Sequence, residues 1–356
     1  MEQVLGDDHL CYILLNFAGE LDEPRARCVS KHWAQLRRRW VSSLPSNACI
    51  HANPVFSPDG AIIAVAGSNY TGNSSPFVMY DVRSGAKRHE IIRPEKVLVG
   101  VGFLGDGGIV AVAGNTSFFS LYDTRTGALL QEVALPDRWT RELAVSPDGA
   151  MLAVGGDDTV CIYDAATFEL RQAIEYYCAK HYAFSPDSAT IAVGGAKKLS
   201  LFDVATGALV CEHDRTTSAS GTWALAFSPD GQLLAVGGDA YDTDDESDDD
   251  GPLVARPVPP LTLYIEAGRV RGPDIACEFA VCCLAFAPNG SVLAVGGMRD
   301  IFVLYDTNTF EVRRTLRSDD WVGRAIAFSP DSSKIAIGTG KIALYETETG
   351  DPVRVP

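Results

Sequence analysis

The sequence of 356 residues predicts an all-β fold, a seven-bladed β-propeller of four-stranded antiparallel blades, with a small N-terminal α-helical segment. Two repeated motifs and their spacing support this prediction. A turn motif of the type Phe-Ser-Pro-Asp-Gly, followed by an apolar run and a glycine pair, recurs seven times, and such a period marks a repeat architecture. The copies begin at Phe56, Phe103, Val145, Phe184, Phe227, Phe286 and Phe328.

Each copy of this motif reads as strand, turn, strand. In the turn, proline presets φ, the Asp side chain bonds backbone two residues further on, and glycine accepts a positive φ. The run after the turn, for example Leu233 to Val236, is apolar throughout and does not alternate. A strand of this composition is expected to be covered on both faces. The glycine pair then ends the strand.

A second motif, an aromatic residue followed by Asp or Glu, comes after six of the seven copies. It leads into another turn and a further short strand, as in the stretch from Asp123 to Leu130, while the fifth unit keeps only a remnant from Leu263 to Gly268. Four short strands per unit, seven times, is the pattern of a seven-bladed propeller. The six pairs are Tyr80-Asp81, Tyr122-Asp123, Tyr163-Asp164, Phe202-Asp203, Tyr305-Asp306 and Tyr345-Glu346.

The spacing of the turns agrees with blade-sized units of about 40–45 residues. The turn positions 59, 106, 148, 187, 230, 289 and 331 are separated by 47, 42, 39, 43, 59 and 42 residues. Only the gap of 59 lies far outside this range, and it contains an acidic insertion, residues 239–253, in the fifth blade.

These units resemble WD repeats, with an aromatic residue and Asp in place of the Trp-Asp dipeptide, over residues 48–356. The Gly-His pair of that family is absent, and its turn aspartate before the third strand is clear only at Asp157. The Asp-Thr-x-Thr-Gly turn at Asp123 also resembles bacterial-type propeller repeats. The resemblance implies a protein-binding scaffold that acts through its loops and the mouth of its central channel.

Composition excludes several classes of partner and of site. The net charge of −16 argues against nucleic acid and against an anionic membrane as partners. The N-terminus is acidic where a signal peptide would be basic, and no apolar run is long enough to cross a membrane.

Nine scattered cysteines without a Cys-x-x-Cys pair favour reduced thiols over disulfides or zinc. We therefore expect a cytoplasmic or nuclear protein.

Residues 1–40 differ in kind from the repeats. Apolar residues at helical spacing predict a first helix, and Pro24 suits the start of a second. The segment is too small to hold a core alone, so it must pack on the propeller or on another protein. Its pattern resembles an F-box, which implies docking on a Skp-type adaptor of a cullin–RING ubiquitin ligase. The residues that carry the resemblance, and the implied adaptor contacts, are Leu5, Leu10, Ile13, Leu14, Phe17, Val29 and Trp33.

Three further segments complete the domain organisation. Residues 41–49 are interpreted as a linker and residues 50–356 as the propeller, whose ring is closed either by residues 351–356 or by residues 41–47. The acidic insertion carries eight carboxylates between Asp239 and Asp250, which predicts a disordered, solvated loop. It lacks the Gly and the terminal Glu of a calcium loop, so we expect no metal there. Ser247 lies in an acidophilic kinase pattern.

One position per blade, four residues before the turn motif, predicts a ligand-binding rim where the inner strands begin. Three cations and a tryptophan share this register in an otherwise acidic chain, and Trp and Arg are enriched at binding hot spots. Such a rim suits a phosphorylated or acidic peptide; the alternative is internal pairing with Glu142, Asp319 or Asp320. The predicted rim residues are Arg141, Lys180, Trp223 and Arg324, with Trp139, Trp321 and His181 nearby and Ala52, Val99 and Cys282 at the remaining positions.

Two functions follow from these patterns. The first is a substrate receptor of an F-box type ubiquitin ligase, in which the helices recruit the adaptor and the rim binds the target. The second is a WD-repeat scaffold outside any ligase, whose helices only cap the propeller. No catalytic triad, phosphate-binding loop or metal-ligand cluster is legible, so we expect a monomeric binding protein that is not an enzyme and needs no cofactor.

Overall fold

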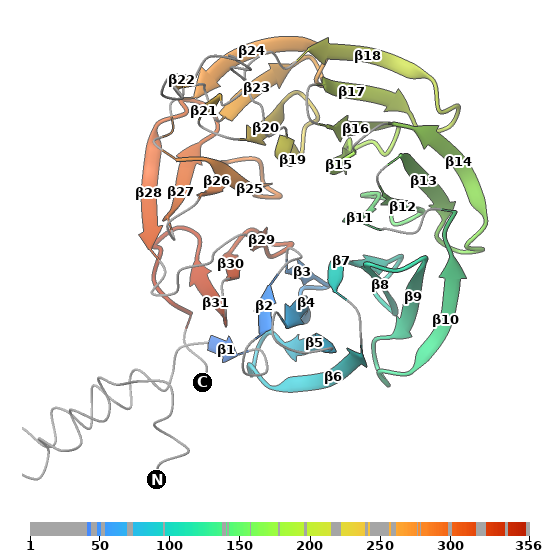
Figure 1. Cartoon of the computed structure of the whole chain (residues 1–356). Helices are drawn as coiled ribbons and strands as arrows, with labels where there is room; N and C mark the ends of the chain where they lie inside the picture. The colour runs from blue at the N-terminus through green and yellow to red at the C-terminus, as the bar shows by residue number, and fades with distance from the viewer. Residues whose placement is uncertain are drawn as a thin grey trace, which may run out of the picture.

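The protein is a closed ring of seven antiparallel sheets around a central channel (Figure 1). The fold is known from a computed structural model, and the predicted seven-bladed propeller with four-stranded antiparallel blades is confirmed. Within the described residues every regular element is a strand. The predicted helical segment, residues 1–40, lies outside them. The structure describes residues 41–43, 48–50, 54–69, 74–94, 97–136, 140, 142–156, 158–176, 179–195, 198–214, 222–238, 241–242, 256–257, 261–275, 277, 279–297, 301–317, 325–338 and 341–353.

The first strand of each blade lies innermost and lines the channel (Figure 1). In the first blade this strand is interrupted, because two short strands pair in succession with the same neighbour. The inner strands are β2 (Ala48–Ile50) with β3 (Val55–Phe56), β7 (Leu98–Leu104), β11 (Glu142–Val145), β15 (His181–Phe184), β19 (Thr222–Phe227), β25 (Val281–Phe286) and β29 (Ala325–Phe328).

The second strands follow the Pro-Asp-Gly turns and are buried on both faces, as their unbroken apolar sequence predicts. In β12, for example, the residues from Leu152 to Gly155 are all buried. The second strands are β4 (Ile62–Asn69), β8 (Ile109–Gly114), β12 (Met151–Gly155), β16 (Thr190–Gly194), β20 (Leu234–Gly238), β26 (Val292–Gly297) and β30 (Lys334–Gly338).

The third strands end at the aromatic-acidic pairs, or at the remnant Tyr264-Ile265 in blade 5. The third strands are β5 (Ser74–Asp81), β9 (Phe118–Asp123), β13 (Thr159–Asp164), β17 (Lys198–Asp203), β23 (Leu261–Ile265), β27 (Ile301–Asp306) and β31 (Lys341–Glu346).

Blade 5 contains an additional pair of short strands. β21 (Tyr241–Asp242) and β22 (Arg256–Pro257) pair with each other between the second and third strands, inside the stretch that holds the acidic insertion.

The outer strands close the blades, and the last one comes from the other end of the chain. β1 (Val41–Ser43) pairs with β31 and completes blade 7. This pairing decides between the two closures that the sequence left open. It also shows that residues 41–49, interpreted as a linker, supply strands β1 and most of β2. The other outer strands are β6 (Lys87–Pro94), β10 (Leu129–Ala134), β14 (Leu170–Glu175), β18 (Leu209–Asp214), β24 (Val270–Ile275) and β28 (Val312–Arg317).

The core is divided into clusters that lie between neighbouring blades. Between blades 1 and 2, for example, Phe77 and Met79 pack with Val101 and Val110, all buried. Corresponding clusters join each successive pair of blades, including blades 7 and 1. A single blade therefore covers its apolar faces only when both neighbours are present.

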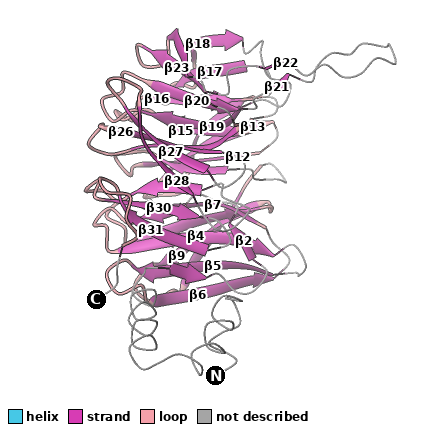
Figure 2. Ribbon diagram, turned by 90° about the vertical axis from the view of Figure 1, so that its left-hand side faces the viewer, coloured by secondary structure: helices cyan, strands magenta, loops and turns pink. Residues whose placement is uncertain are grey.

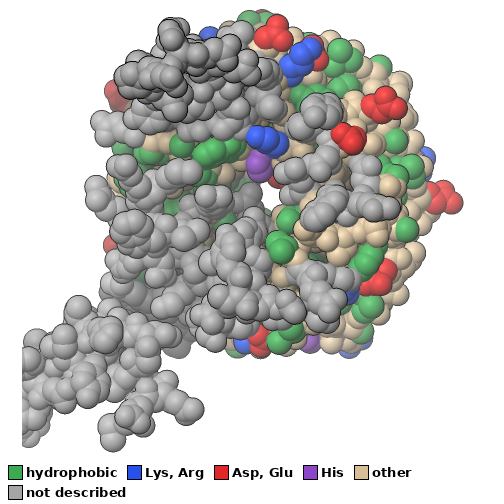
Figure 3. Space-filling view, in the orientation of Figure 1, with side chains coloured by type: hydrophobic (Ala, Val, Ile, Leu, Met, Phe, Trp, Pro, Cys, Tyr) green, Lys and Arg blue, Asp and Glu red, His purple; other side chains and the backbone are tan. Residues whose placement is uncertain are grey.

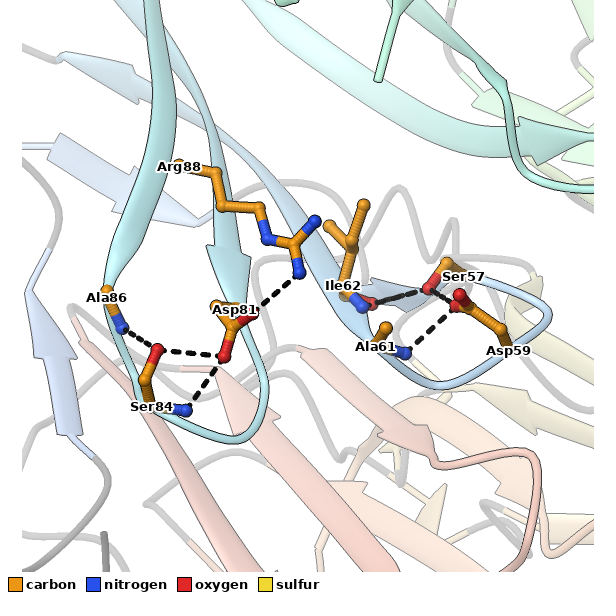
Figure 4. A network of polar contacts seen from close by, with 8 residues as sticks. All are labelled: Ser57, Asp59, Ala61, Ile62, Asp81, Ser84, Ala86 and Arg88. Carbon is orange, nitrogen blue, oxygen red and sulfur yellow. Dashed lines mark hydrogen bonds and ion pairs between the residues drawn. The ribbon is translucent and has the colours of Figure 1, made fainter. Parts of the chain in front are cut away.

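Five of the seven turns between the first and second strands share one hydrogen-bond network, drawn for blade 1 in Figure 4. Ser57 Oγ donates to Asp59 Oδ1 at 2.5 Å, and the N–H groups of Ala61 and Ile62 donate to Asp59 Oδ1 (3.0 Å) and Ser57 Oγ (2.9 Å). The predicted bond from the Asp side chain to backbone two residues on is thus formed. The same network recurs at Ser146, Ser185, Ser228 and Ser329.

Two blades carry serine where this turn elsewhere has glycine. Ser188 and Ser332 adopt φ values of 60° and 61°, in the left-handed region that favours glycine. Each hydroxyl accepts a bond from the turn of the preceding blade: the Asp148 N–H lies 3.3 Å from Ser188 Oγ, and the Asn289 N–H lies 2.9 Å from Ser332 Oγ. A bond between blades therefore offsets the backbone strain.

The turns between third and fourth strands contact the neighbouring blade in two ways. Outer-strand side chains bond turn carbonyl oxygens of the next blade; His89 Nε2, for example, lies 3.0 Å from Arg125 O and Gln172 Nε2 lies 2.8 Å from Ala205 O. In blades 3 and 6 the turn instead places Phe168 (φ 58°) or Phe310 (φ 55°) where other blades have glycine. These rings pack on the clusters shared with the preceding blade.

The turn carboxylates predict a loss of stability in acid. Hydrogen bonds lower the pKa of Asp331 to about 2, chiefly from the Ser329 hydroxyl, and the pKa of Asp81 to about 2, chiefly from Arg88. Because these folded-state pKa values lie below the ordinary aspartate value of 3.8, the stabilisation is present above about pH 4 and is lost as the pH falls toward 2.

We therefore expect the urea unfolding midpoint to fall steadily between pH 4 and pH 2.5. Asp331→Asn should make this dependence shallower, because asparagine keeps an acceptor oxygen and does not titrate. A midpoint that stays constant over this range would contradict the prediction.

Candidate binding site at the channel mouth

The structure places two of the predicted rim residues at the start of adjacent inner strands. Lys180 directly precedes β15, its N–H donating to Gly194 O at 2.9 Å, and Trp223 is the second residue of β19. Both side chains are partly buried. Arg141, Arg324, Trp139 and Trp321, predicted for the same rim, lie outside the described residues. The shared surface of all six remains a prediction.

A carboxylate of blade 3 is bound to blade 4 beside Lys180. Glu142 Oε2 accepts the N–H of Tyr182 at 2.8 Å and lies 3.4 Å from His181 Nδ1. The Tyr182 hydroxyl donates to the backbone carbonyl of Glu142, and burial raises the pKa of that phenol. Glu142, weighed above as an internal partner for the rim cations, is therefore engaged by His181 and by backbone.

The space-filling view shows this mouth of the channel (Figure 3). A basic side chain and a histidine border the central opening on this face. Figure 2 shows that β21 and β22 lie toward the same face, while the described turns gather along the opposite one.

A cavity of about 440 Å³ runs along the channel wall between blades 1, 2 and 3. The described residues that line it are of apolar type or glycine, except Glu142, and polar atoms share its surface with apolar ones. The lining extends from Val99 and Glu142, near the starts of β7 and β11, to the turn prolines Pro58 and Pro147. Sequence reasoning missed this cavity. Its only signal is the small-residue sequence of β7, in which Gly100 and Gly102 line the cavity.

The same glycines let blades 2 and 3 approach closely. A Cβ at Gly100 would lie 2.5 Å from Leu143 Cβ, and one at Gly102 would lie 2.4 Å from Val145 Cγ2. These distances are too short for real side chains, so the contact of β7 with β11 requires glycine.

Other candidate chemistry is limited. In the part of the chain that the structure describes, no group of three or more His, Cys, Asp and Glu side chains could hold a metal ion. None of the described residues forms a helix long and apolar enough to cross a membrane. Cys161, Cys211, Cys277, Cys282 and Cys283 form no disulfide, and burial raises the pKa of Cys283 and of Cys277. The predicted adaptor contacts, Leu5 to Trp33, lie outside the described residues.

Comparison with known proteins supports the repeat assignment. Residues 139–164, 210–242 and 275–306 match the family profile described as "WD domain, G-beta repeat". The chain is a seven-bladed propeller that contains WD40 repeats. The matched stretches cover strands of blades 3 to 6, and WD40 propellers as a class are protein-interaction modules.

A solved chain of Kuenenia stuttgartiensis hydrazine synthase has the same fold as this WD40 propeller. The two superpose with a TM-score of 0.70 and 17% identity, over 85% of this chain and 96% of that one. At this identity the likeness concerns the fold alone. No curated protein sequence matches the chain.

Close packing of blades 2 and 3 gives a stability prediction. We expect Gly102→Ala to lower the free energy of unfolding by about 1–3 kcal/mol, because the added methyl group overpacks the contact with Val145. Gly108→Ala is the control, since its Cβ would meet only the end of the Asp106 side chain, at 3.1 Å. Urea unfolding of both variants measures the difference. Equal stability would show that β7 and β11 can move apart without cost.

Proposed function

We propose that this WD40 propeller is the substrate receptor of a cullin–RING ubiquitin ligase of the F-box type. The observation that carries the proposal is the attachment of an F-box-like sequence, residues 1–40, directly to a propeller that contains WD40 repeats. In this arrangement the segment recruits a Skp-type adaptor and the propeller binds the protein to be modified.

The proposed target surface is the channel mouth at Lys180 and Trp223, together with Arg141 and Arg324. The target is a phosphorylated or acidic peptide, because cations at one register of an acidic protein favour a concentrated negative charge. The described part of the rim supports this assignment in one respect. Lys180 and Trp223 stand at the starts of adjacent inner strands, and both side chains are partly exposed.

The second candidate is a scaffold outside any ligase, in which residues 1–40 only cover part of the propeller. The position of β1 favours this scaffold candidate. Val41 is fixed to the outer edge of blade 7 and follows Trp40 directly, so residues 1–40 are joined to the propeller without a linker. In either case we propose a monomeric cytoplasmic or nuclear protein that binds other proteins, has no enzymatic activity and uses no cofactor.

Adaptor binding distinguishes the two candidates. We expect full-length protein to co-precipitate with a Skp-type adaptor, and Leu10→Asp combined with Leu14→Asp to abolish this binding by placing charges on the apolar face of the first predicted helix. Glu20→Gln in the same segment is the control and should bind as the unaltered protein does. Adaptor binding that is absent, or that survives the double substitution, supports the scaffold.

The rim is tested separately on a phosphorylated target captured from cells by full-length protein. We expect Lys180→Glu to lower capture by about ten-fold, since a like charge at the rim repels the phosphate. Lys334→Glu, next to the turn of blade 7 at the other end of the channel, is the matched control. Equal capture by both variants would remove this surface from the proposal.

A further inference from the structure

The mouth of the channel opposite Lys180 and Trp223 carries a ring of exposed carboxylates. It is formed by the turns between first and second strands, which lie at the far ends of the inner strands. The turn residue is Asp in six blades and Asn in the other, and each of these side chains is exposed. The ring consists of Asp59, Asp106, Asp148, Asp187, Asp230, Asn289 and Asp331.

Hydrogen bonds hold five of these carboxylates in the charged form. Hydrogen bonds from the turn serines lower the pKa values of Asp59, Asp148, Asp187 and Asp230, as they do for Asp331. Among the described residues, the positive charges of Arg88, Arg269 and Lys334 act on Asp59, Asp187 and Asp331 respectively.

The basic groups do not balance the ring. Arg88 already pairs with Asp81 at 2.6 Å, an interaction repeated by Arg171 with Asp164 and by Arg313 with Asp306. In blades 2 and 4 the equivalent of this arginine is Leu130 or Val210. Within the described residues, the mouth therefore keeps an excess of negative charge.

The cavity opens onto this acidic mouth and offers apolar side chains along its wall. Pro58 and Pro147, which immediately precede Asp59 and Asp148 in their turns, line its end, and Val55, Phe103 and Ala144 line its wall. Among the described lining residues, only Glu142 is charged; it lies at the far end and is held by His181 and Tyr182. A volume of about 440 Å³ falls within the range of about 300–1,000 Å³ of ligand-binding pockets.

We infer that this mouth docks a basic peptide segment of another protein, which inserts an apolar side chain into the cavity between blades 1, 2 and 3. The carboxylates of those blades, Asp59, Asp106 and Asp148, attract the Lys and Arg residues that flank the inserted side chain. Charge complementarity selects the occupant, because an acidic or neutral segment gains nothing from the ring. The site is separate from the proposed target surface, which lies at the other mouth.

The experiment uses full-length protein and a fluorescein-labelled peptide with three Arg or Lys residues on each side of a Leu-Phe pair. Binding is measured by fluorescence anisotropy at low salt. We expect the combined substitution Asp59→Asn, Asp106→Asn and Asp148→Asn to weaken binding by about ten-fold, as the loss of three exposed ion pairs predicts. Asn289 shows that asparagine suits this turn, since its Oδ1 accepts the Ser291 N–H at 3.0 Å.

Two matched controls separate the ring and the cavity from general charge. The combination Asp123→Asn, Asp203→Asn and Glu266→Gln removes the same charge from outer turns of the same face and should leave the affinity within two-fold. Ala144→Leu fills the cavity and should weaken binding, whereas Ala327→Leu, at the equivalent position of blade 7, should not. Replacing Leu-Phe by Gly-Gly in the peptide should weaken binding in the unaltered protein.

Several outcomes would overturn the inference. Equal losses from the inner and outer triple substitutions would mean attraction by net charge alone. Equal binding of the Leu-Phe and Gly-Gly peptides would exclude the cavity. Tighter peptide binding after the combined substitution Arg37→Gln, Arg38→Gln and Arg39→Gln would mean that the basic residues 37–39 of this chain compete with the peptide for the mouth. None of these results depends on adaptor binding, so the proposed function stands or fails independently.

Discussion

Apolar packing between neighbouring blades is the constraint on which the rest of this structure depends. A four-stranded sheet of this length exposes two apolar faces, and its second and third strands are apolar on both. Each face is covered by the next sheet, as where Phe77 meets Val101 or where Tyr80 meets Leu344 across the closing contact. A linear stack would leave an uncovered apolar face on its first and last sheets, so the sheets close into a ring and leave a channel.

Polar contacts then fix how the blades sit against one another. In blades whose turn between third and fourth strands carries glycine, side chains of the preceding blade such as His89 and Gln172 bond the backbone carbonyl groups of that turn. Where the turn carries Phe168 or Phe310, an aromatic ring fills the same place and the backbone accepts a left-handed conformation. Strain of about 1–3 kcal/mol at such a residue persists only if its surroundings compensate it, and the packing of these rings supplies the compensation.

The repeated motifs predict most of the fold because each one has a local cause. The Ser-Pro-Asp turn determines its own hydrogen bonds, and the apolar runs require cover on both faces, so blade number and strand order follow from the sequence. Ring closure does not follow, because Val41 to Ser43 carry no pattern that distinguishes them from a connecting segment. The candidate site is less predictable still. Lys180 and Trp223 share a register that can be counted, but the cavity depends on how Gly100 and Gly102 admit Leu143 and Val145, which only the three-dimensional packing reveals.

Closure by β1 has a consequence for how the molecule is made. The strand that completes the last blade leaves the ribosome before the rest of the ring, and it must remain unpaired until β31 has been synthesised some 300 residues later. Such a contact between distant parts of the chain is formed late and slowly during folding. Whatever is joined upstream of Val41 is therefore anchored at one defined point on the circumference, and only once translation of the ring is finished.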